Sequence, residues 1–148
     1  MLQTKSIVLT IFITVICEVE MVNAVDLNRE ISESLKEARE LIENEQYETA
    51  FDILIVEITK NPNDAEAHNL AGFAARNSGN LGDAATHYAI ALQLDPEHKG
   101  ALEYQGELYL LLKRPKKAKI NLERLHQICG IDCEEYQDLL EALSNYQD

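Results

Sequence analysis

Two cysteines four positions apart, Cys129 and Cys133 in the segment CGIDC, are the residues of this chain best suited to covalent chemistry. Two neighbouring thiols can catalyse thiol–disulfide exchange, bind a metal ion or close into a structural disulfide. Catalytic dithiols usually stand as Cys-x-x-Cys at the start of a helix, where the helix dipole favours the thiolate. Here the spacing is one residue longer, and Cys129 ends a helical pattern. We therefore predict a structural disulfide and keep a redox protein that uses Cys129 and Cys133 as the alternative.

Other patterns that carry chemistry are weak. A zinc site made of Cys129, Cys133 and His126 lacks a fourth ligand nearby. The histidines at positions 68, 87, 98 and 126 show no metal-binding spacing, and neither a phosphate-binding glycine loop nor a nucleophile elbow is recognisable. We predict no metal, no cofactor and no catalytic residue, and we expect His68 to be a hydrogen-bonded interior residue.

The first 24 residues have the features of a secretory signal peptide. Lys5 precedes the uninterrupted apolar run IVLTIFITVIC at 7–17, which is shorter than the about 20 residues needed to span a bilayer. Small residues at Val22 and Ala24 predict cleavage after Ala24, with an uncleaved anchor as the alternative. We therefore expect a signal peptide at 1–24 and an exported, periplasmic domain at 25–148. In that oxidising compartment two cysteines four apart most simply pair with each other.

The chain is acidic, with 13 Lys and Arg against 26 Asp and Glu and a formal net charge of −13. This balance argues against nucleic acid as a partner and against docking on an anionic membrane surface. One stretch has the opposite charge: five of the seven residues from 113 to 119 are basic. That cluster is either a solvated helix start or a second docking patch for an acidic partner or headgroup.

Apolar residues spaced three and four apart predict helices along the whole remaining chain. The predicted helices are 25–44, 47–58, 65–78, 81–92, two within 99–129, and a last one over 134–146. Asn61-Pro62-Asn63-Asp64 and Asp95-Pro96 separate helices because proline cannot continue one. Gly79 suits a left-handed helix stop, and Pro115 suits the first turn of the helix it opens. The fold class predicted is all-α, with about seven helices.

Small residues and prolines recur in this chain with a period of 34. Residues in phase are Ala50, Ala84 and Ala118; Ala38, Gly72 and Gly106; and Pro62 and Pro96. An internal repeat of this length indicates helical hairpins that stack side by side, because one hairpin cannot bury its apolar face alone.

These residues resemble the tetratricopeptide repeat. The resemblance covers Ile31 to about Asp132, with repeats at about 31–64, 65–98 and 99–132, and it places 133–147 as the C-terminal capping helix of an α-solenoid. Two departures are visible: His68 stands where the family often has Trp, and Gly130 replaces the third proline. The bulky residues at 88, 109 and 122 are expected to fill the space beside the small ones.

In this family the first helix of each pair lines an inner groove, which binds an extended or helical segment of another protein. The groove positions that the resemblance implies are Leu35, Arg39, Ile42, Glu43, Glu66, Asn69, Phe73, Arg76, Asn77, Glu103, Glu107, Leu110 and Leu111. One subfamily holds a C-terminal carboxylate with Lys and Asn at set positions of this groove. The rows that correspond here read Leu35, Asn69, Glu103 and Arg39, Phe73, Glu107, so that clamp is absent.

The groove residues instead predict mixed chemistry. Arg39 and Arg76 suit an acidic side chain, Phe73 and Ile42 an apolar one, and Glu103 and Glu107 a basic one. Any single charged residue among them can equally be a solvated surface group.

The resemblance implies a non-enzymatic interaction module or scaffold of the bacterial cell envelope that binds a protein or peptide partner. With three repeats the groove is short, so either the partner segment is short or the protein forms a homodimer.

Overall fold

The computed structural model describes residues 33–147, and the chain divides into two compact units, Met1–Ser34 and Leu35–Asp148. Only the last two residues of the first unit are described, and they open a helix. The predicted signal peptide 1–24, with Cys17 and the cleavage position after Ala24, lies outside the described residues. The predicted start of the first helix, with Leu27 and Ile31, lies outside them as well.

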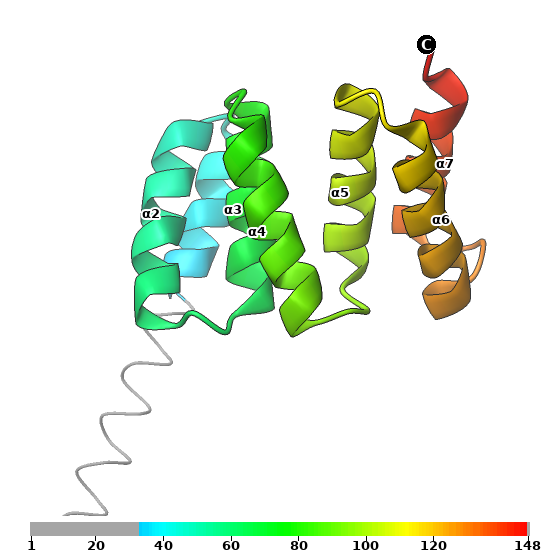
Figure 1. Cartoon of the computed structure of the whole chain (residues 1–148). Coiled ribbons are helices and arrows are strands. Elements are labelled where there is room, and N and C mark those ends of the chain that lie inside the picture. The colour runs from blue at the N-terminus through cyan, green and yellow to red at the C-terminus, as the bar shows by residue number, and fades with distance from the viewer. Residues whose placement is uncertain (1–32, 148) are drawn as a thin grey trace, which may run out of the picture. The chain divides into compact units, whose positions relative to one another are not determined.

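The described residues are helical, and no strand occurs among them. After a first helix described over 33–43 come α2 (Tyr47–Lys60), α3 (Ala65–Asn77), α4 (Leu81–Leu94), α5 (Lys99–Leu111), α6 (Pro115–Cys129) and α7 (Glu134–Asn145). The helices of the second unit succeed one another along it, joined by short turns (Figure 1). The all-α prediction is confirmed. Within 33–147, no helix combines the length and apolar character that crossing a membrane requires.

Helix ends follow the chemistry of the residues found there. The Asp64 carboxylate caps α3 by accepting hydrogen bonds from the backbone N–H groups of Glu66, at 2.9 Å, and Ala67, at 3.0 Å. Gly79 has a φ of +86°, which permits the sharp exit from α3, and Pro115 stands in the first turn of α6 as predicted. His98 caps α5 with its Nδ1, which accepts from the Ala101 N–H at 3.2 Å.

The small residues of the repeat mark close helix contacts. A Cβ on Gly72 would lie 2.7 Å from two ring carbons of Tyr88, so glycine lets α3 approach the buried tyrosine of α4. Gly106 on α5 meets Leu139 of α7 in the same way, at 2.6 Å. The alanines in phase at positions 50, 84 and 118 are all fully buried, and so is Ala38, which is in phase with Gly72 and Gly106. Equal spacing in the sequence therefore corresponds to equal burial in the fold.

The last helix covers the end of the third repeat. Leu139 of α7 forms one buried cluster with Leu102 of α5 and Leu125 of α6. On the other side of α7, Glu134, Asp138 and Glu141 are exposed. One face of α7 thus hides apolar surface and the other meets solvent, which is the arrangement expected of a capping helix.

Candidate functional site

Alternate helices of the second unit together line a pocket of ≈ 350 Å³. We call it the acidic pocket. Its lining comes from α3, from α5 and its capping residue, and from α7: Glu66, Asn69, His98, Gly100, Glu103, Tyr104, Glu134, Glu135 and Asp138. Five of these side chains carry a carboxyl group and none is Lys or Arg. Helices α3, α5 and α7 therefore form one surface, and carboxyl groups are the commonest polar groups of its pocket.

Glu103 is the most enclosed carboxyl group of the acidic pocket. It is 7% exposed, and it makes no hydrogen bond or ion pair with any described residue. Burial is the largest effect that raises the pKa of Glu103, and repulsion from Glu107, Asp138 and Glu135 raises it further, to about 8. The attraction of Arg76 acts in the opposite direction and lowers this pKa. A cation placed beside this carboxyl group stabilises its ionised form.

Glu66 is the opposite case, because it is held by three partners. Its carboxylate accepts hydrogen bonds from Arg39 Nη2 at 2.8 Å, from His98 Nε2 at 3.0 Å and from Asn69 Nδ2 at 3.2 Å. Burial by itself raises the pKa of Glu66, but these bonds outweigh it and leave the pKa below its ordinary value. The hydrogen bond to Glu66 raises the pKa of His98, although burial of the imidazole lowers it. The His98–Glu66 pair thus ties the cap of α5 to the first turn of α3.

Arg76 of α3 is occupied in the same manner. Its guanidinium pairs with the Glu107 carboxylate and lies over two rings, 5.3 Å from the centre of Phe73 and 5.5 Å from that of Tyr104. The mixed chemistry expected for the groove stays a prediction. Arg39 and Arg76 are each engaged by a carboxylate of the same chain, and the groups left without a counter-charge are acidic.

The structure brings only part of the predicted groove set into the acidic pocket. Glu66, Asn69 and Glu103 line it, and Arg39, Phe73, Arg76 and Glu107 support it from the contacts just described. The remaining predicted residues lie elsewhere: Leu35 and Ile42 pack against a buried apolar cluster, Glu43 is exposed, Asn77 bonds the Phe73 carbonyl, Leu110 is buried and Leu111 is exposed. Their assignment to a groove stays a prediction.

The sequence reasoning missed the pocket residues of α7. Carrying the period of 34 one repeat further finds them, because Glu134 follows Glu66 and Gly100 in phase, and Asp138 follows Tyr104. The period of 34 thus indicates these residues, whereas the family resemblance assigns the last helix only a capping role. His98 could be found from its place one residue before a helix start, although histidine is not a common cap.

The two cysteines lie at the turn between α6 and α7. Their Sγ atoms are 2.02 Å apart, which is bonding distance, and their Cα atoms are 5.8 Å apart. The Glu135 carboxylate lies within 4.8 Å of both sulfurs, but it pairs with Lys99 Nζ at 3.0 Å. The structural disulfide stays a prediction, and nothing in the described residues supports the alternative of a redox enzyme.

Histidine 68 lies where the sequence predicted it, in the interior. It is buried, its Nδ1 is 3.1 Å from His87 Nδ1, and its Nε2 is 3.2 Å from the Pro62 carbonyl oxygen. The basic cluster of 113–119 is exposed apart from Pro115 and Ala118, and the Lys117 ammonium lies 5.2 Å from the centre of the Tyr109 ring. Both interpretations of that cluster stay open.

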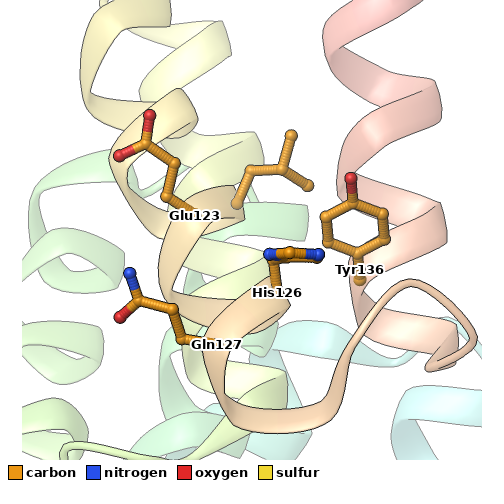
Figure 2. Close-up of a pocket in the computed structure, with 5 residues that line it drawn as sticks. Glu123, His126, Gln127 and Tyr136 are labelled. Carbon is orange, nitrogen blue, oxygen red and sulfur yellow. The ribbon is translucent and has the colours of Figure 1, made fainter.

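A second hollow, of ≈ 280 Å³, lies between α6 and α7 and is lined by Leu122, Glu123, His126, Gln127 and Tyr136 (Figure 2). The His126 and Tyr136 rings face each other across it, with centres 5.7 Å apart. Glu123, His126 and Gln127 are exposed surface groups on one helix. This hollow holds no buried polar group without a partner, so the acidic pocket is the stronger candidate site.

Comparison with known proteins gives one family and one fold. The sequence profile of the tetratricopeptide repeat family matches residues 65–98. No curated protein sequence matches the chain. Among solved structures, the chain is similar to the first repeat domain of Spaghetti (RPAP3) bound to an HSP90 peptide, SRMEEVD, with a TM-score of 0.70 and 16% identity over 77% of this chain and 90% of that one.

Two further structures show the same fold. The Sgt2 domain from Aspergillus fumigatus has a TM-score of 0.71 and 20% identity, and the alignment covers 78% of this chain and 77% of that one. The Yersinia enterocolitica type III secretion chaperone SycD, in complex with a peptide of the translocator YopD, has a TM-score of 0.66 and 15% identity, with 76% of this chain and 86% of that one covered.

Proposed function

Residues 65–98 of this chain are a tetratricopeptide repeat and the described residues have the fold of such domains; from that premise, we propose that the protein is a non-enzymatic interaction module. It binds a short segment of another protein on the surface formed by α3, α5 and α7. The observation that carries the proposal is the acidic pocket, where alternate helices converge on polar groups that lack partners.

Two similar structures support a peptide as the kind of ligand. The RPAP3 domain is bound to an HSP90 peptide, and SycD is in complex with a peptide of YopD. The peptide SRMEEVD contains three acidic residues, whereas five carboxyl groups line the acidic pocket. Like charges repel at this range, so the ligand of this chain differs from that peptide in charge.

A displayed library of random short peptides, selected against the full chain, tests this function. Selected peptides are expected to bind with a Kd that calorimetry can measure. Phe73→Ala removes the aromatic side chain that packs on Tyr104, with ring centres 4.8 Å apart, and is expected to weaken binding about tenfold or more. Ile120→Ala on α6 removes a side chain that is also apolar but 56% exposed, and it serves as the matched control.

The controls decide what a loss of binding means. Circular dichroism establishes that both variants remain helical. As a second measurement, a photoreactive aromatic residue in place of Phe73 is expected to crosslink to the peptides, and one in place of Ile120 is not. Peptides that bind both variants as tightly as the wild type, or that crosslink from Ile120, would contradict the proposal.

The cellular context is part of the proposal. We infer that the chain is exported to the bacterial periplasm, is cleaved after Ala24 and serves there as a scaffold. The support is the pattern of Lys5, the apolar run at 7–17 and Val22-Asn23-Ala24. The mass of the protein recovered from a periplasmic extract tests it, since cleavage leaves a chain that begins at Val25. A protein that retains residue 1 would contradict cleavage.

A further inference from the structure

The acidic pocket contains three carboxyl groups that pair with no cation among the described residues. Arg39 pairs with Glu66, Arg76 pairs with Glu107, and Lys99 pairs with Glu135 at 3.0 Å. Glu103, Glu134 and Asp138 have no hydrogen-bond or ion-pair partner among residues 33–147. Two of the three are exposed, but Glu103 is only 7% exposed and lies in a pocket lined by helices of the second and third repeats and by the capping helix.

A neutral group in the same pocket also lacks a partner. Asn69 is 4% exposed; its Nδ2 donates to Glu66, whereas its Oδ1 accepts no hydrogen bond in the described structure. Buried carbonyl oxygens without a donor are uncommon, and each costs about 1–3 kcal/mol when it loses water. A ligand that donates hydrogen bonds therefore suits the unpartnered acceptors of this pocket.

Building on the proposed function, we propose that the acidic pocket receives an arginine side chain of the partner segment, with its guanidinium donating to Glu103, Asn69 Oδ1 and Asp138. Arginine fits because its planar head carries five N–H donors directed outward. The aromatic ring of Tyr104, which lines the pocket, already has the Arg76 guanidinium 5.5 Å from its centre, so the site suits this group.

A metal ion fits less well than an organic cation. A divalent ion needs its ligand atoms gathered tightly round one point. The acidic pocket offers no three carboxylate or imidazole ligand atoms within 4.8 Å of one another, whereas that criterion is met in residues 33–147 by Cys129, Cys133 and Glu135. An organic cation does not need its ligand atoms gathered round one point in this way.

Arginine binding makes the site sensitive to pH. Glu103 faces Glu66 and Arg76 on α3, Glu107 beside it on α5, His98 and Lys99 at the start of α5, and Glu134, Glu135 and Asp138 on α7. Since its pKa is about 8, Glu103 is mostly protonated at pH 7 and ionises when a cation binds. Affinity for arginine is therefore expected to rise between pH 6 and pH 8, by at most about tenfold per unit, with release of a proton.

The test is a titration of the full, isotopically labelled chain with the blocked peptide acetyl-Gly-Arg-Gly-amide, followed by NMR. The matched probe, acetyl-Gly-citrulline-Gly-amide, has nearly the same shape and no charge. The arginine probe is expected to shift the Asn69 side-chain amide and the Gly100 backbone amide in a saturable way, and the citrulline probe is not. The acidic probe acetyl-Gly-Glu-Gly-amide, which lacks arginine, is expected to leave both signals unchanged.

Variants locate the effect. Glu103→Gln keeps the shape of the pocket and is expected to weaken the arginine probe about tenfold or more, because a buried counter-charge is lost. Glu141→Gln removes an exposed charge from α7 outside the acidic pocket and is expected to change affinity by less than about twofold. Equal shifts from both probes, shifts scattered over exposed carboxylates, or unchanged affinity in Glu103→Gln would overturn the arginine assignment.

The two proposals fail differently. If peptides selected from the library lack arginine, depend on Phe73 and bind Glu103→Gln as tightly as the wild type, the arginine pocket is wrong and the interaction module stands. If no selected peptide depends on Phe73, the module itself is wrong. Self-association that needs both Glu103 and the basic cluster at 113–119 would show that a second copy of the chain occupies the pocket, which also overturns the assignment to a partner protein.

Discussion

At the scale of single residues, Glu57 of α2 is a buried carboxyl group in a position that the other repeats fill with apolar side chains. It is 1% exposed, and neither of its carboxyl oxygens has a hydrogen-bond partner in the described structure. Its equivalents one and two periods later are Ala91 and Leu125, both fully buried. Glu57 therefore weakens the first repeat.

Replacing this residue is expected to stabilise the protein. Glu57→Leu should raise the free energy of unfolding by about 1–3 kcal/mol, because the cost of a buried polar group without a partner disappears. Urea denaturation followed by circular dichroism measures it. Glu57→Gln is the control, with a smaller gain, since an amide still lacks partners there. A less stable Glu57→Leu protein would mean that the carboxyl group has a partner beyond residues 33–147.

The pair between His98 and Glu66 predicts a defined pH window. The raised pKa of His98 contributes stability that is fully present below pH 6.5 and is lost as the pH rises through the folded-state pKa. The lowered pKa of Glu66 contributes stability present above pH 4.5 and lost as the pH falls through the folded-state pKa. The pair is therefore strongest between these two pH values.

A variant that keeps the cap isolates this pair. His98→Asn removes the charge, so it should lower stability by up to about 1 kcal/mol near pH 5.5 and have little effect at pH 9; the loss at pH 5.5 is limited because protonated His98 can no longer accept from the Ala101 N–H at Nδ1, whereas Asn can cap α5. Thermal denaturation across this pH range measures the difference. Glu66→Gln should show the same window, and the double variant should show no added pH dependence. A deficit that is constant with pH would contradict an ionic pairing.

At the scale of helices, alanine substitutions at two helical glycines are expected to change the free energy of unfolding in opposite directions. Gly72→Ala should cost about 1–3 kcal/mol, because its Cβ meets the fully buried Tyr88 ring at 2.7 Å. Gly82→Ala should gain about 0.5–1 kcal/mol, because alanine favours helix and nothing lies within 4 Å. Urea denaturation of both proteins tests the contrast. Stabilisation by both substitutions would mean that α3 and α4 are not in close contact at Gly72.

The turn between α6 and α7 predicts a redox-dependent stability. Closing the loop from Cys129 to Cys133 is worth about 2 kcal/mol by the chain-entropy estimate. Cys129→Ser with Cys133→Ser should therefore lower the melting temperature, and so should reduction of the wild type. The mass after thiol alkylation without reductant establishes whether the two cysteines are paired. Insulin reduction by the wild type that is lost in Cys129→Ser would favour the redox alternative instead.

At the scale of the whole molecule, charge is the dominant feature. The chain carries 26 acidic against 13 basic side chains, and several basic ones are already paired within the acidic pocket region. Self-repulsion of this kind weakens the compact state, and salt screens it beyond about 8 Å at physiological ionic strength. Moderate sodium chloride is therefore expected to raise the melting temperature by a few degrees. A fall with added salt would show that attractive pairs dominate.

What the sequence determined by itself was the kind of fold and most of its helix boundaries. Apolar spacing and proline positions act locally, so Asn61–Asp64, Gly79 and Pro115 could be placed without tertiary information. The period of 34 predicted which small residues would be buried, because stacked hairpins give equivalent positions equivalent neighbours.

Only the tertiary structure decided the chemistry of the groove. Whether Arg76 is free or paired depends on Glu107, 31 residues away, and whether Glu103 is paired depends on three helices at once. Ion pairs and burial are properties of neighbours in space, and the periodicity of a single helix does not contain them. For that reason the sequence predicted a groove of mixed charge, and packing of α3, α5 and α7 made its centre acidic.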